Sequence, residues 1–160
     1  MTDDVYKQLA RALDLLPGGF PETKSGVELQ ILRKIFSLEE AQLASNMTGT
    51  REEVDVIAAR AKLSREETEK RLEAMLSKGL VWAFEKGGSW KFRLTPDVVG
   101  FYEEQWQIMD HELAHLFEQY LNEGGAEGIM RPQPALHRVV PAYQALKTEV
   151  ILPYDDVKAL

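Results

Sequence analysis

The chain has 160 residues, of which 44% are hydrophobic and 28% charged, and its formal net charge is −7. This length fits one domain with a smaller appended element, and no apolar run approaches the ~18 residues that a membrane-spanning helix needs. The absence of cysteine excludes disulfides and thiolate metal sites, and the acidic N-terminus is unlike a secretory signal, so we expect a cytoplasmic protein without a membrane partner.

The first predicted element is a helix over residues 3–16. Its apolar residues recur every three or four positions, at Val5, Leu9, Leu13 and Leu16. Pro17-Gly18-Gly19 then ends the helical pattern, and residues 1–24 are interpreted as an N-terminal helix with its loop.

Four Ser/Thr-x-x-Glu pairs follow, and each predicts a helix start. In such a capping box the hydroxyl accepts a hydrogen bond from the first helical turn, while the carboxylate reaches back to the cap residue. The pairs are Ser25/Glu28, Ser37/Glu40, Thr50/Glu53 and Ser64/Glu67. We expect the four helices to end near Phe36, Met47, Lys62 and Lys78.

The segment from Thr50 to Arg93 has the element order of a winged helix. Two predicted helices meet at a short turn, Lys62–Leu63, and the second one stops at Gly79. Two aromatic-rich runs, residues 80–84 and 89–94, then flank a turn at residues 85–88, which is typical of a β-hairpin. This order places a recognition helix and a wing on one surface, and residues 25–95 are interpreted as the winged-helix domain. The hairpin tryptophans, Trp82 and Trp90, are expected to pack on the helices.

Beyond the hairpin, one long helix is predicted from Thr95-Pro96-Asp97 to about Asn122. Its apolar stripe comprises Tyr102, Trp106, Met109, Leu113, Leu116 and Tyr120. Residues 96–123 are therefore interpreted as a packing or dimerisation helix. Residues 124–160 contain several prolines and are expected to form an extended arm with one or two strands. Residues 154–160 resemble the first turns of a helix, which suggests that the chain is a fragment leading to a further domain. The predicted fold class is mainly α with a small β-hairpin.

The charges of the winged-helix segment leave two functions open. Residues 50–93 carry ten Lys/Arg and eight Asp/Glu, whereas the remainder of the chain has a balance of −9. Glutamates at positions 66, 69 and 73 share the outer face of the recognition helix with Arg65 and Lys70, and a DNA-reading helix usually presents cations and amides there. Protein docking is therefore preferred. If DNA is bound instead, its expected contacts are Arg65, Lys70, Arg71, Lys86, Lys91 and Arg93.

A third hypothesis comes from His111-Glu112-Leu113-Ala114-His115, which matches the H-E-x-x-H motif of zinc hydrolases. His137 is the other histidine of the chain. On a helical projection both motif histidines point away from the apolar stripe, and a catalytic zinc needs a walled cavity with second-shell partners. We therefore assign no catalytic residue and no metal ligand, and a surface metal site at His111 and His115 is kept only as an alternative.

Several short stretches give a family resemblance. They are Leu16-Pro-Gly-Gly-Phe-Pro, Ser25-Gly-Val-Glu-Leu, Gly79-Leu-Val, Pro96-Asp-Val-Val-Gly-Phe-Tyr-Glu, Arg138-Val-Val-Pro and Leu152-Pro-Tyr-Asp-Asp-Val. With these, the chain resembles the winged-helix-containing N-terminal region of bacterial and archaeal ferredoxin-type iron–sulfur proteins. In that family, a cysteine-rich segment that binds 4Fe–4S clusters follows the last of these stretches. This sequence contains no cysteine, so no cofactor is assigned to it and the clusters are expected only in a downstream region.

The resemblance implies a non-enzymatic docking module of a longer electron-transfer protein. Its partner would be a redox protein or its own downstream ferredoxin domain, and a homodimer is also considered. The alternative is a dimeric winged-helix transcriptional regulator that binds DNA.

Overall fold

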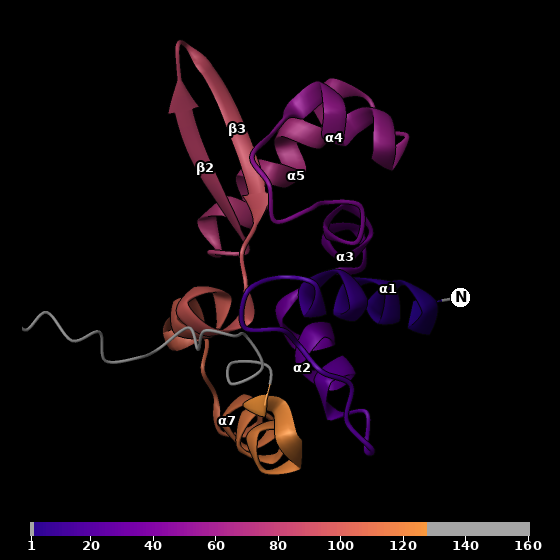
Figure 1. Ribbon diagram of the computed structural model, residues 1–160, viewed down its shortest axis with the longest axis vertical. Helices are drawn as coiled ribbons and strands as arrows, with labels where there is room; N and C mark the ends of the chain where they lie inside the picture. The colour runs from indigo at the N-terminus through magenta and orange to yellow at the C-terminus, as the bar shows by residue number, and fades with distance from the viewer. Residues whose placement is uncertain (1, 128–160) are drawn as a thin grey trace, which may run out of the picture.

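The computed structural model describes residues 2–127, which form a mainly helical fold with a small three-stranded antiparallel sheet (Figure 1). At this level the predicted fold class is confirmed. From residue 128 onward, the predicted extended arm, with His137 and the helical start at residues 154–160, lies outside the described residues. Among residues 2–127, none of the helices combines the length and the apolar character that crossing a bilayer would require.

Three helices form the N-terminal half of the core. They are α1 (Thr2–Asp14), α2 (Val27–Ile35) and α3 (Leu38–Ala44), and α1 contacts both of the others. The predicted periodicity of α1 is confirmed, since Leu9 and Leu13 are completely buried, although the helix ends at Asp14 rather than Leu16. Fully buried Ile31, Leu32 and Leu43 face them from α2 and α3.

Two of the four predicted capping residues cap their helices. The Ser37 hydroxyl accepts a hydrogen bond from the Glu40 backbone N–H (3.2 Å), and the Glu40 carboxylate accepts one from the Ser37 N–H (2.8 Å), which makes a complete capping box at α3. Ser64 accepts a hydrogen bond from the Glu67 N–H (3.1 Å) and caps α5 (Arg65–Ser77).

The helix predicted after Ser25 is present, but the capping box predicted for Ser25 and Glu28 is wrong. Gly26, in a left-handed conformation, occupies the cap position of α2 without a side-chain cap, and the Ser25 hydroxyl accepts a 3.3 Å hydrogen bond from the Val27 N–H at the start of the helix. Glu28 is buried and accepts hydrogen bonds from both the backbone N–H and the hydroxyl of Thr23 instead. The carboxylate that a capping box would use thus organises the preceding loop.

The Thr50/Glu53 box is also wrong, because a strand occupies its place. Glu52–Glu53 form β1, which pairs with β3, and α4 (Val54–Ala61) begins directly after it without a side-chain cap. Thr50 exchanges a 2.8 Å hydrogen bond with the Thr48 hydroxyl. Two guanidinium nitrogens of Arg60 donate hydrogen bonds to the Glu52 carboxylate, and this ion pair links β1 to the helix α4 that follows it.

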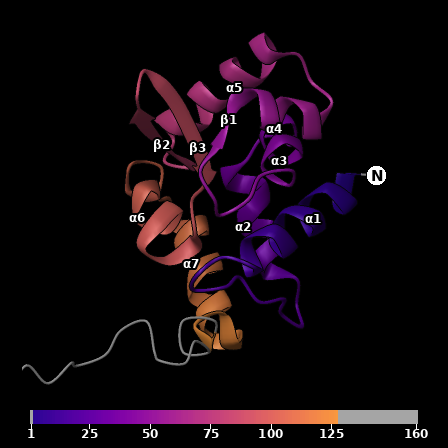
Figure 2. The same cartoon turned by 45° about the horizontal axis from the view of Figure 1, so that its top comes forward.

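The predicted hairpin is confirmed. Strands β2 (Val81–Lys86) and β3 (Ser89–Leu94) are joined by Gly87 and Gly88, whose φ angles of 63° and 79° suit a tight two-residue turn. The strand order is β1-β3-β2. The predicted turn between α4 and α5 is present as well, with Lys62 in a left-handed conformation. In Figures 1 and 2 the hairpin stands beside α4 and α5, which contact each other, and α5 contacts β2.

The single long helix predicted after the hairpin is wrong. A π-type turn, η1 (Asp97–Phe101), contains extended Val98 and left-handed Val99, and the short α6 (Tyr102–Glu104) and η2 (Gln105–Gln107) follow. A new helix, α7 (His111–Tyr120), begins because the Asp110 carboxylate accepts a 2.7 Å hydrogen bond from the Leu113 N–H, and η3 (Leu121–Gly125) closes it. The predicted stripe is accordingly broken: Leu113 and Tyr120 are buried, whereas Trp106 is 71% exposed.

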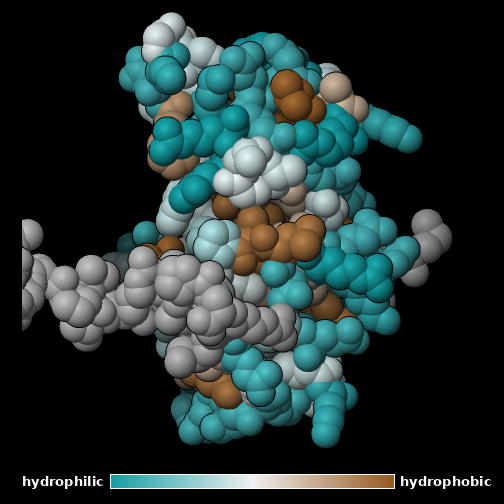
Figure 3. All heavy atoms as spheres, in the orientation of Figure 1, coloured by the Kyte–Doolittle hydropathy of each residue, from teal (hydrophilic) through white to brown (hydrophobic). Residues whose placement is uncertain are grey.

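Helix α7 packs against α2 and completes the core. Aromatic rings join the two halves: Phe101 contacts Phe20 and Phe36 edge to face, and Phe20 also contacts Tyr120. On the face seen in Figure 3, hydrophobic surface gathers at mid-height, below the hairpin, while the surface above and below it is mostly hydrophilic.

Candidate functional site

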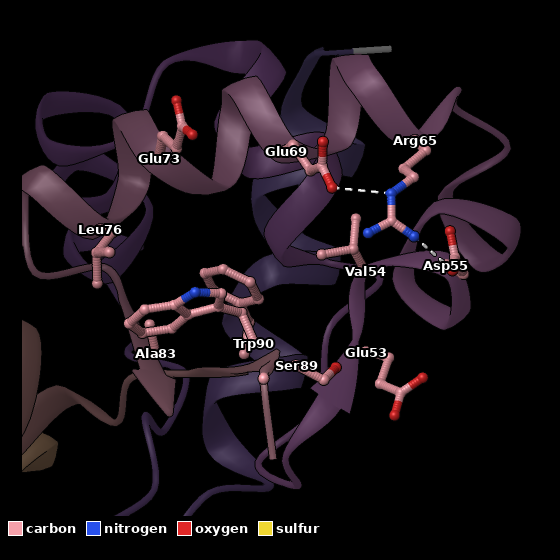
Figure 4. A pocket seen from close by; sticks show the side chains of 12 residues that line it. Glu53, Val54, Asp55, Arg65, Glu69, Glu73, Leu76, Ala83, Ser89 and Trp90 are labelled. Carbon is pink, nitrogen blue, oxygen red and sulfur yellow. Dashed lines mark hydrogen bonds and ion pairs between the residues drawn. The ribbon is translucent and has the colours of Figure 1, made fainter. Parts of the chain in front are cut away.

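A groove of about 400 Å³ lies between α5 and the sheet (Figure 4). Residues of α5 form one wall, and the hairpin forms the other. The lining residues are Glu53, Val54, Asp55, Arg65, Glu69, Glu73, Leu76, Ala83, Gly88, Ser89, Trp90 and Phe92. A volume of this size is within the range of ligand-binding clefts.

The apolar part of the groove is exposed to solvent. Trp90 is 54% exposed and Leu76 is 41% exposed, although both are large hydrophobic side chains. Alternate residues of a strand share a face, so Trp90 lies on the same side of β3 as Phe92, which is buried. Trp90 is closer to the turn and lines the groove together with Leu76 of α5, so the predicted packing on the helices is only partial. Exposed aromatic side chains flanked by polar residues are typical of binding surfaces.

The polar part of the groove is acidic. Four carboxylates line it, and Arg65 is the one cation among the lining residues. The Arg65 guanidinium donates to Asp55 (2.7 Å) and to Glu69 (2.9 Å), and the hydrogen bond to Asp55 contributes most to raising the pKa of Arg65 above its usual value. Because Arg65 is already shared by two carboxylates, the groove presents a negative field to an approaching partner.

The structure does not bring the predicted DNA contacts together on one surface. Arg65 lies in the acidic groove, whereas Arg71 donates to Glu67 (2.8 Å) and to the Glu39 carbonyl (3.2 Å), and is largely buried. Lys70 is exposed on α5. The three remaining predicted contacts, Lys86, Lys91 and Arg93, lie on the hairpin.

The hairpin cations lie on the sheet face opposite the groove. Trp82 pairs across the strands with Arg93, and Phe84 pairs with Lys91, so these four residues share a face that alternates with the one carrying Ala83 and Phe92. The Arg93 guanidinium stacks on the Trp82 ring, 4.3 Å from its centroid. Lys91 forms a 3.4 Å ion pair with Glu53, and Lys86 is exposed near the turn.

Arg51 also belongs to this face, and sequence reasoning missed it. Its guanidinium lies 3.9 Å from the centroid of the Phe84 ring. The residue precedes β1, and its place beside β2 and β3 depends on a strand that the sequence pattern did not predict. The sequence offered one signal for this contact. Arg51 directly precedes Glu52–Glu53, a segment that can pair with the aromatic-rich hairpin.

The H-E-x-x-H motif begins α7, and its side chains point outward. His111 and His115 are exposed, as the helical projection predicted, and their ring centroids are 4.4 Å apart. Glu112 forms a 2.7 Å ion pair with Lys34 of α2, and His115 Nδ1 lies 3.3 Å from a Glu118 carboxylate oxygen. Among residues 2–127, no group of three or more His, Cys, Asp or Glu side chains is arranged to hold a metal ion. The motif carboxylate is thus held by a lysine.

Comparisons with known proteins give no assignment. No family model matches the chain. Searches of the curated proteins and of the solved structures also give no significant match.

Proposed function

We propose that residues 25–95 form a winged helix that acts as a non-enzymatic protein-docking module, with the groove between α5 and the hairpin as its recognition surface. The observation that carries this proposal is the combination of exposed Trp90 and Leu76 with four carboxylates in one groove. The order of α4, a turn, α5 and a hairpin supports the winged helix, as does the packing of α5 on α3 and of β1 on β3.

The chemistry of the groove selects a partner with basic residues around an apolar side chain. The apolar side chain would cover Trp90 and Leu76, and lysines or arginines would pair with Glu69 and Glu73 along α5. Complementary charge of this kind speeds encounter and excludes wrong partners. Phosphates, by contrast, would meet carboxylates wherever they approached this helix, and Arg65 and Arg71 would have to leave their present acceptors to bind them.

The second candidate function, a dimeric DNA-binding regulator, is favoured by one observation. The outer face of the hairpin carries Arg51, Lys86, Lys91 and Arg93 beside two aromatic rings. A wing with these cations could contact a phosphate backbone without the participation of α5.

The resemblance to ferredoxin-type iron–sulfur proteins suggests the setting of the docking module. In this proposal the basic partner surface belongs to a redox protein or to a ferredoxin domain that carries 4Fe–4S clusters. These 160 residues include no cysteine, so the thiolate ligands would come from outside them. Iron and acid-labile sulfide measured in native complexes of the tagged protein test this setting: stoichiometric amounts are expected, and complexes without iron contradict it.

The docking proposal is tested by binding assays with two labelled probes, an amphipathic helix of lysine and leucine and a mixed-sequence DNA duplex. We expect the peptide to bind, and the double variant Glu69→Gln/Glu73→Gln to bind it roughly three- to tenfold more weakly. The matched control is Glu22→Gln/Glu66→Gln, which has the same net charge but leaves the groove unchanged, and its affinity should equal that of the wild type. The regulator would be favoured instead if the duplex bound more tightly than the peptide and its affinity fell steeply with rising salt concentration.

A further inference from the structure

We propose that a second pocket, on the outer side of the sheet, binds a small carboxylic acid that has an apolar body. This pocket has a volume of about 330 Å³ and lies at the base of the hairpin. Its lining includes Leu16, Trp82, Arg93, Leu94, Val98 and Val99. The inference concerns a different surface from the acidic groove and does not depend on the docking function.

Arg93 supplies the anion-binding group. It is the one charged residue in the lining, and it stacks on the Trp82 ring, but no carboxylate among the described residues forms an ion pair with it. Its Nε atom is buried and has no hydrogen-bond partner within residues 2–127. Burial, followed by the charge of Arg51, lowers the pKa of the Arg93 guanidinium below its usual value. A partly buried cation without a counter-ion is unfavourable, and an anionic group in the pocket would relieve it.

Part of the pocket lining belongs to a strained loop that includes Val98 and Val99. Val99 adopts φ 56° and ψ 47°, a left-handed conformation that is disfavoured for a β-branched residue. The Glu103 carboxylate maintains this conformation by accepting hydrogen bonds from the backbone N–H groups of Val99 (3.0 Å) and Gly100 (2.8 Å). Such strain is concentrated at ligand-binding sites, where the surrounding structure holds it in place. It is an observation independent of the unpaired arginine.

The remaining lining restricts the ligand to one chemical class. Apart from Arg93, the side chains that line the pocket are apolar or aromatic, so a ligand with several charges or many hydroxyl groups would leave its polar atoms unpaired. A single carboxylate can receive the two parallel hydrogen bonds of a guanidinium, and its apolar chain can lie against Trp82, Leu94 and Val98. The volume suits an acid with an alkyl or aryl body of moderate size.

The test is a titration of the full 160-residue protein, labelled with ¹⁵N, with octanoate as the probe. The three tryptophans give three indole signals, from Trp82, Trp90 and Trp106. We expect octanoate to shift the Trp82 indole and the Val98 and Val99 amides in a saturable way, and to leave the other two indoles unchanged. Octanol, which lacks the charge, and inorganic phosphate, which lacks the apolar body, should not reproduce these shifts at the same concentration.

Two variants and one control locate the interaction. Arg93→Gln should weaken octanoate binding by about tenfold or more, because a hydrogen bond to a charged group is lost. Val98→Phe should block binding by filling the pocket while Arg93 remains, which covers the case in which the arginine variant perturbs the fold. Lys86→Gln removes a cation from the hairpin outside the pocket, so its affinity should match that of the wild type. Equal shifts with octanol, or undiminished binding by both pocket variants, would overturn the proposal.

Discussion

Replacing Asp97 with asparagine should remove a pH-dependent loss of stability. Asp97 is 5% exposed, and its Oδ1 atom has no hydrogen-bond partner among the described residues. Burial raises the pKa of the Asp97 carboxyl from 3.8 to about 7, and the nearby charge of Glu103 adds to the rise. An ionised aspartate in this place is unfavourable, whereas a neutral amide of nearly the same shape is not subject to the same penalty.

The direction of the effect follows from proton linkage. Between its unfolded pKa of 3.8 and its folded pKa of about 7, Asp97 is protonated in the folded chain and ionised in the unfolded chain. Its contribution to stability is therefore complete below pH 3.8 and is lost as the pH rises to about 7. At about 1.4 kcal/mol per pKa unit the whole loss is about 4 kcal/mol, of which about 2 kcal/mol falls between roughly pH 5.5 and pH 8.5.

Urea unfolding followed by circular dichroism at these two pH values measures the effect. The free energy of unfolding of the wild type should fall by about 2 kcal/mol more than that of Asp97→Asn. The control Glu22→Gln neutralises an exposed carboxylate and should follow the wild type. Parallel pH profiles of Asp97→Asn and the wild type would contradict this prediction, because they would show that Asp97 is already ionised in the folded protein at the lower pH.

Substitutions at three further positions test the local structure, each through the free energy of unfolding in urea. Glu40→Ala removes the acceptor of both the Ser37 N–H and the Lys78 ammonium, and should destabilise the protein by about 2 to 3 kcal/mol; a loss under ~0.5 kcal/mol contradicts a structural role for this buried carboxylate. Gly88→Ala should cost about 1 kcal/mol, because the residue has positive φ and open space for a methyl group, and an unchanged stability would mean that the turn differs. Asp110→Ala should cost about 1 kcal/mol through loss of the α7 cap, whereas Asp110→Asn should retain most of the stability; equal losses argue against the cap.

Local signals in the sequence predicted the elements that depend on local chemistry. Gly87 and Gly88 suit a turn that needs two positive φ angles, and Ser37 and Ser64 sit where a hydroxyl can cap the following helix. Such features involve residues a few positions apart, so their pattern is readable without a fold. The hairpin, α3 and α5 were predictable for this reason.

Elements that depend on distant partners were not predictable in the same way. The Glu52–Glu53 strand exists because β3 offers it hydrogen bonds, although the two segments are far apart in the sequence. The break before α7 is stabilised by Lys34 of α2, which donates to Asp110 at 3.0 Å. The apolar stripe continued through that break, and periodicity alone therefore indicated one long helix.

The same distinction applies to the candidate site. Arg65 and Glu69, and likewise Glu67 and Arg71, form ion pairs one turn apart on α5, a local spacing that was not used when both arginines were assigned as possible DNA contacts. The contacts of Arg65 with Asp55 and of Arg93 with Trp82 required the fold. Those contacts divide the predicted cations between two surfaces, and the acidic groove combines its carboxylates with the exposed aromatic side chain of Trp90.

The most direct test of the docking proposal is a map of where the lysine–leucine peptide binds. In a ¹⁵N-labelled protein, we predict that the peptide shifts the Trp90 indole signal and the Glu69 and Glu73 amides, with the Trp106 indole unchanged. Trp90→Ser should weaken peptide binding by more than about tenfold while the spectrum stays dispersed. Peptide binding that leaves these groove signals unchanged, or that survives loss of Trp90, would contradict the proposal that this groove is the docking surface.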